Sequence, residues 1–91
     1  MAEGVSAVKQ AIVRDFGRIE VTERHDFNTK DTILDFTSEN RPFAVEVTRE
    51  FDDDYATSKV KVDLRKLGAI LRGSANGKVI VMRSGIRPKV A

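Results

Sequence analysis

The sequence predicts a small α/β domain in which a helix, a three-stranded meander, a second helix and a final strand follow in that order (αβββαβ), with a four-stranded mixed sheet. The 91 residues are 41% hydrophobic and 33% charged. A chain of this length and composition has enough apolar surface to bury one modest core. Apolar residues recur at helical spacing near the N-terminus and again after the middle of the chain, whereas segments rich in β-branched and aromatic residues lie between and after them. Residues 1–91 are therefore interpreted as one domain.

The first predicted helix covers residues 4–16 and ends at Gly17, because glycine readily adopts the left-handed conformation found after a helix. Its apolar positions form one face: Val5, Val8, Ile12 and Phe16. Ile19 and Val21 then alternate with polar residues, which predicts a half-buried strand over residues 18–24.

A hairpin is predicted from residues 32–37 and 43–49, since both segments are rich in β-branched and aromatic residues and residues 38–42 have turn chemistry. If Ser38 lies opposite Phe43, Asp35 lies directly across from Glu46. The same register gathers apolar side chains on the other face: Leu34, Phe36, Val45 and Val47.

The second helix is predicted to begin at residues 52–54, whose aspartates supply an N-cap and first-turn negative charge, and to continue to Leu71. Residues 59–64 also alternate like a strand, so a helical and an extended conformation both fit them. Residues 73–77 break the chain, and residues 79–82 are typical of a buried strand. Residues 84–91 are expected to form an irregular basic tail that carries Arg87 and Lys89.

Charge is unevenly distributed along the chain. Residues 1–54 contain seven Lys and Arg against thirteen Asp and Glu, a balance of −6, whereas residues 55–91 contain nine against one, a balance of +8. Clustered Lys and Arg gain affinity for nucleic acids by releasing counterions from phosphates. The basic C-terminal third therefore favours DNA or RNA as a partner, unless it only neutralises the acidic part of the same fold.

Several classes of site are excluded by composition. The chain has no cysteine and a single histidine, His25, so disulfides, thiolate zinc sites and histidine metal clusters are absent. No apolar run approaches the roughly 20 residues that span a bilayer, and the first residues do not resemble a secretory signal. We expect a cytoplasmic protein with no membrane partner.

Asp35 and Glu46 are the strongest candidates for a catalytic metal site. In the expected register their Cβ atoms are about 4.5–5.5 Å apart, a distance at which two carboxylates repel. Mg²⁺ would relieve this repulsion, because it binds through one or two carboxylates together with water and substrate phosphate. The alternative is that both acids lie on a solvated sheet face.

The order of elements resembles the core of the PD-(D/E)XK nuclease superfamily, which includes restriction endonucleases and repair nucleases. The resemblance covers about residues 4–82 and depends on Leu34-Asp35-Phe36 on the second strand and Glu46-Val47-Thr48 on the third. It implies a metal-dependent DNA nuclease with Mg²⁺ as cofactor. Asp35 and Glu46 would be its metal ligands, and Thr48 would take the third catalytic position.

Thr48 stands where the superfamily has its catalytic lysine. A hydroxyl cannot supply the positive charge of an ammonium group, so the resemblance implies a nuclease-like fold that binds nucleic acid. Phosphodiesterase activity would need a lysine from outside the strand, such as Lys59 or Lys61, at the site.

Five basic residues of the predicted second helix either contact phosphates or form an ordinary solvated helix surface: Lys59, Lys61, Arg65, Lys66 and Arg72. Two other functions are alternatives. A helix, three strands and a helix is also the order of a double-stranded RNA-binding domain, whose second helix presents lysines to phosphates. An uncovered strand edge would instead favour a non-catalytic homodimer.

Overall fold

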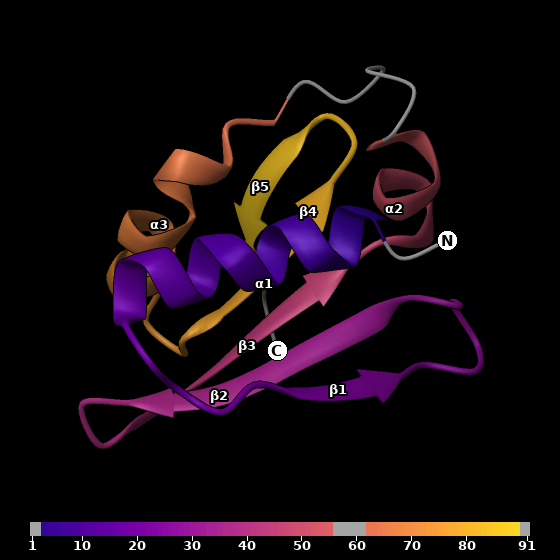
Figure 1. Ribbon diagram of the computed structural model, residues 1–91. Helices are drawn as coiled ribbons and strands as arrows, with labels where there is room; N and C mark the ends of the chain where they lie inside the picture. The colour runs from indigo at the N-terminus through magenta and orange to yellow at the C-terminus, as the bar shows by residue number, and fades with distance from the viewer. Residues whose placement is uncertain (1–2, 56–61, 90–91) are drawn as a thin grey trace.

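The computed structural model describes residues 3–55 and 62–89, which form two layers: a mixed sheet and helices packed on one of its faces (Figure 1). The helical elements are α1 (Glu3–Phe16), α2 (Arg49–Tyr55), the 3₁₀ turn η1 (Leu64–Lys66) and α3 (Leu67–Gly73). The strands are β1 (Thr22–His25), β2 (Thr32–Ser38), β3 (Arg41–Val47), β4 (Lys78–Met82) and β5 (Gly85–Pro88). The predicted α/β class and the first helix are confirmed.

The sheet has five strands in sequence order, one more than predicted. Neighbouring strands are antiparallel except β3 and β4, which are parallel and joined by the crossover that contains α2 and α3. The extra strand is β5, which pairs with β4 across the turn at residues 83–84 and turns Ile86 toward the core. The prediction of an irregular tail from residue 84 is therefore wrong for Gly85–Pro88.

The core lies between the sheet and α1, with α2 near the N-terminal end of that helix and α3 near its C-terminal end (Figure 1). Alternate residues of each central strand face it, and its fully buried members include Ile12, Leu34, Val45 and Val81. Three phenylalanine rings close one end, with centroids 5.0 to 5.3 Å apart: Phe16, Phe36 and Phe43. Burial of these side chains holds the layers together.

The turn of the β2–β3 hairpin is shorter than predicted. Glu39 and Asn40 form a two-residue turn with φ of 57° and 62°, positive values that a type I′ turn requires at both central positions. Ser38 therefore pairs with Arg41 instead of Phe43, so the predicted register is wrong by two residues. An even shift keeps every side chain on its expected face.

The second helix begins earlier than predicted. The Thr48 hydroxyl accepts a hydrogen bond from the Phe51 amide (3.3 Å), so the helix is capped at Thr48 and starts at Arg49. For the same reason β3 ends at Val47 and not at residue 49. The aspartates at 52–54 therefore lie inside α2 and not at its N-terminus.

The prediction of one continuous helix up to Leu71 is also wrong. Asp63 has an extended backbone, and its carboxylate accepts a hydrogen bond from the Arg65 amide (3.0 Å), which starts a new helical segment at Leu64. Both a helix and a strand are predicted as possible for residues 59–64. Residues 59–61 lie outside the described residues, and Val62 and Asp63 form neither a helix nor a strand. The first strand differs too, because β1 starts at Thr22 and not at residue 18.

Aspartates from neighbouring elements cap all three α-helices of the described residues. Each carboxylate accepts a hydrogen bond from an amide in the first turn of a helix to which it does not belong, where an uncapped N–H would lack a partner. The bonds join Asp52 to the Val5 amide of α1 (3.0 Å), Asp31 to the Arg49 amide of α2 (3.0 Å) and Asp15 to the Gly68 amide of α3 (3.2 Å). Part of the acidity of the first 54 residues therefore serves the fold.

Candidate functional site

No described helix packs on the second face of the sheet, which we call the outer face (Figure 1). Its side chains alternate with those of the core, and Lys89 joins it because its amide bonds to the Lys78 carbonyl (2.9 Å) beyond the end of β5. The outer face comprises Thr22, Arg24, Ile33, Asp35, Ala44, Glu46, Lys78, Ile80, Arg87 and Lys89.

Asp35 and Glu46 lie on this same face but not directly across from each other. Asp35 pairs with Ala44, and Glu46 pairs with Ile33, so the two acids are diagonal neighbours. Diagonal residues on adjacent strands are about 7–8 Å apart at Cα, which weakens the repulsion expected for directly facing carboxylates.

Each of the two acids has a basic partner from an edge of the sheet. Arg24 of β1 makes a two-pronged contact with Asp35, including an Nη2–Oδ1 distance of 3.1 Å, and this carboxylate raises the pKa of Arg24. Lys89, which follows β5, donates from Nζ to Oε1 of Glu46. Glu46 is only 8% exposed, so its charge is compensated mainly by this ammonium group.

In the predicted metal site, both carboxylates are held by basic side chains. Among the described residues, no group of three or more acidic or histidine side chains is placed to hold a metal ion. An ion bound between Asp35 and Glu46 would have to displace the side chains of Arg24 and Lys89 and draw two diagonal positions together. No chemical step is therefore assigned to a metal.

Thr48, which the predicted resemblance assigns to the position of a catalytic lysine, has a structural role in the fold. Its hydroxyl donates to the Val81 carbonyl (3.1 Å) and accepts from the Phe51 amide (3.3 Å). These bonds join the ends of β3 and β4 to the start of α2. The one proton of the hydroxyl is therefore engaged in the bond to Val81.

The predicted basic helix face is only partly described. Lys59 and Lys61 lie outside the described residues, whereas Arg65 and Lys66 are exposed on η1. Arg65 pairs with Asp63 (3.0 Å). Arg72 lies over the Phe16 ring, 4.3 Å from its centroid, and donates to the Asp15 carbonyl (2.9 Å), so it joins α3 to α1. Arg65, Lys66 and Arg72 belong to the helical layer and not to the outer face.

The sequence predicts the cations of the outer face only in part, since it offers Arg87 and Lys89 as phosphate contacts of a flexible tail. Arg24 and Lys78 are not among the predicted phosphate contacts, and Arg87 and Lys89 are assigned to a tail although they lie on the sheet. A signal was present in the sequence: Ser84-Gly85 can form a turn, and Ile86 and Arg87 begin an apolar–polar alternation after it.

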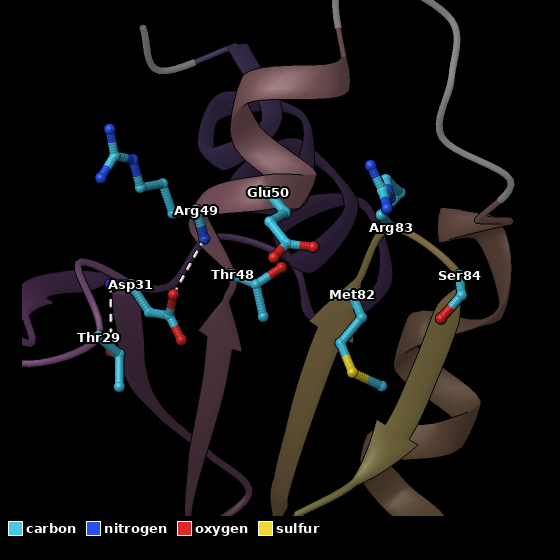
Figure 2. A pocket seen from close by; sticks show the side chains of 8 residues that line it. All are labelled: Thr29, Asp31, Thr48, Arg49, Glu50, Met82, Arg83 and Ser84. Atoms are coloured by element: carbon cyan, nitrogen blue, oxygen red, sulfur yellow. Dashed lines mark hydrogen bonds between the residues drawn. The ribbon is translucent and has the colours of Figure 1, made fainter.

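A cavity of about 460 Å³ lies at the carboxyl ends of the parallel strands β3 and β4. This edge of an open α/β sheet is a common place for ligands. Figure 2 shows Thr29 and Asp31 on one wall, where the Asp31 carboxylate meets the Arg49 amide, and Met82 and Ser84 on the other. The lining residues are Thr29, Asp31, Thr48, Arg49, Glu50, Met82, Arg83 and Ser84.

No protein family, curated protein or solved structure matches this chain. None of the described helices has the length and apolar composition needed to cross a bilayer.

Proposed function

We propose that this chain is a nucleic-acid-binding protein with a nuclease-like core, and that it holds the phosphate backbone on its outer face. The observation that carries the proposal is the charge of that face, where four cations accompany two carboxylates. Arg24 and Lys89 pair with the acids, while Lys78 and Arg87 form no ion pair within the described part of the chain. Unpaired cations on an uncovered face attract a polyanion.

The strand order supports the nuclease-like core over the RNA-binding alternative. A parallel β4 beside β3 completes the αβββαβ order on which the resemblance depends. A double-stranded RNA-binding domain ends at its second helix, so β4 and β5 would have no counterpart there. Nucleic acid therefore remains the proposed partner. Its proposed binding surface is the outer face of the sheet and not the helical layer.

The site favours binding over cleavage. Basic side chains stand beside Asp35 and Glu46, where a nuclease of this superfamily would place a metal ion, and Thr48 is engaged in the fold. Contacts to phosphates alone carry no sequence information, so binding is expected to depend strongly on salt and weakly on sequence.

Paired charge reversals test where the nucleic acid binds. Lys78→Glu with Arg87→Glu is expected to lower the affinity for a mixed-sequence DNA by about tenfold or more at ~0.1 M salt, measured by fluorescence anisotropy. The matched control is Arg65→Glu with Lys66→Glu, which reverses two charges on the helical layer and is expected to change the affinity little. A larger effect of the control would move the interface to the helices. Absence of binding by the wild type, with a dimer seen by light scattering, would favour an interaction module.

Magnesium titration tests for catalysis. In NMR spectra we expect no Mg²⁺-dependent shifts at Asp35 and Glu46, and no nicking of supercoiled DNA. Shifts at both residues that disappear in Asp35→Asn, together with nicking that also disappears, would show a metal-dependent phosphodiesterase. In that case Lys89, whose ammonium group contacts Glu46, would take the role of the catalytic lysine that Thr48 replaces in the resemblance.

A further inference from the structure

An exposed aromatic side chain, Phe27, lies in the loop between β1 and β2, and other residues of the same loop line the cavity of Figure 2. Phe27 is 86% exposed, more than any other large hydrophobic side chain of the described residues. Its loop supplies Thr29 and Asp31 to the cavity wall. A phenylalanine left in water forgoes about 1.5–3 kcal/mol of burial free energy, so its position calls for an explanation.

The loop around Phe27 is held by its own hydrogen bonds. The Asp26 carboxylate accepts from the amides of Asn28 (2.8 Å) and Thr29 (3.3 Å), and these bonds lower the pKa of Asp26. The Asp26 carbonyl accepts from the Lys30 amide (2.8 Å). Because these bonds hold the backbone of the loop, less backbone entropy is lost when the loop binds a partner.

We propose that Phe27 stacks on an unpaired base of the bound nucleic acid and that the cavity beside its loop receives the adjoining nucleotide. This inference rests on the proposed function and specifies single-stranded nucleic acid as the preferred partner. Every base has a flat face that stacks on an aromatic ring, whereas the bases of a duplex are already stacked inside the helix.

The chemistry of the cavity beside the Phe27 loop favours a nucleotide over an apolar partner. The cavity volume of about 460 Å³ falls in the range of small-ligand sites. Its walls carry the hydroxyls of Thr29 and Ser84 and the carboxylates of Asp31 and Glu50, groups that suit base edges and sugar hydroxyls. A second copy of this chain, docking through an apolar contact, would not match the hydroxyl and charged groups of these walls.

The test compares Phe27→Ala with Val13→Ala, because Val13 is also an exposed apolar side chain (44%) but lies on α1 in the helical layer. Affinities for a single-stranded oligonucleotide and for its duplex are measured by fluorescence anisotropy at one salt concentration. Phe27→Ala should weaken single-strand binding by about tenfold and leave duplex binding within about twofold. Phe27→Trp should retain single-strand binding, and Val13→Ala should change neither affinity.

The controls separate this inference from the proposed function. If Lys78→Glu with Arg87→Glu weakens binding but Phe27→Ala does not, the stacking role is wrong and the outer-face interface stands. If the wild type binds neither nucleic acid, both proposals are wrong. If Phe27→Ala instead converts a dimer into a monomer by light scattering, the ring serves a contact between copies and the stacking role is overturned.

Discussion

Glu46 is a carboxylate that lies nine-tenths buried on the face of the sheet that no described helix covers. A buried charge is costly unless a partner compensates it, and the ammonium group of Lys89 provides that compensation. Asp35 differs, because it is about one-third exposed and water shares in solvating its pair with Arg24. The two ion pairs of this face are therefore expected to contribute differently to the free energy of unfolding.

Lys89→Met is expected to lower the free energy of unfolding by about 2 kcal/mol, because it leaves Glu46 buried without a counter-charge. Adding Glu46→Gln should restore part of this loss. Arg24→Met, which removes the cation of the more exposed pair, should cost clearly less than Lys89→Met. Urea unfolding measures the free energy of unfolding of the wild type and of these three variants. Equal losses for Lys89→Met and Arg24→Met would contradict the difference in burial.

Asp52→Ala is expected to lower the free energy of unfolding by about 1 kcal/mol, because it removes the cap of α1 although the substitution lies in α2. Asp53→Ala is the matched control, since Asp53 makes only an exposed pair with Arg49 (3.5 Å) and should cost less than about 0.5 kcal/mol. Chemical denaturation distinguishes the two, and a similar cost for both would mean that Asp52 acts only through the charge of its own helix.

At the level of the elements, the β2–β3 turn offers a stabilising substitution. Glu39 has a left-handed backbone (φ 57°) that an ordinary side chain adopts at a cost, whereas Asn-Gly is the preferred pair for this turn. Glu39→Asn with Asn40→Gly should therefore raise the free energy of unfolding by about 0.5–1 kcal/mol. Asn28→Gly is the control, because Asn28 lacks a positive φ and should not gain stability. A melting temperature that rises for Asn28→Gly and not for the turn variant would refute the argument.

Local periodicity was enough to predict some elements and not others. α1, the two hairpin strands and β4 have clear apolar patterns, and they are found where expected, with differences of a few residues at their ends. The hairpin register was not predictable in this way, since Glu39 gives no sign that it adopts a left-handed conformation. The second helix also failed as one element, because Thr48 and Asp63 act as caps whose hydrogen bonds decide where helical segments begin.

At the level of the whole molecule, the positive charge of the C-terminal third divides between two surfaces. Arg65 and Lys66 lie on the helical layer, and Lys78, Arg87 and Lys89 lie on the outer face. Sequence alternation correctly puts Asp35 and Glu46 on one face, but their basic partners come from β1 and from the residue after β5. Such partners depend on which strands become neighbours, and the local sequence pattern does not contain that information.

The division of charge predicts how binding depends on salt. Each phosphate neutralised by a cation contributes about −0.9 to the slope of log Kobs against log salt concentration for duplex DNA, and about −0.7 for a single strand. Lys78→Glu with Arg87→Glu removes two cations of the outer face, so the slope should become shallower by at least about 1.4 for a single strand. Arg65→Glu with Lys66→Glu should leave the slope unchanged. Because the slope counts contacts independently of overall affinity, a shallower slope in the second variant alone would place the phosphates on the helical layer and refute an interface on the sheet.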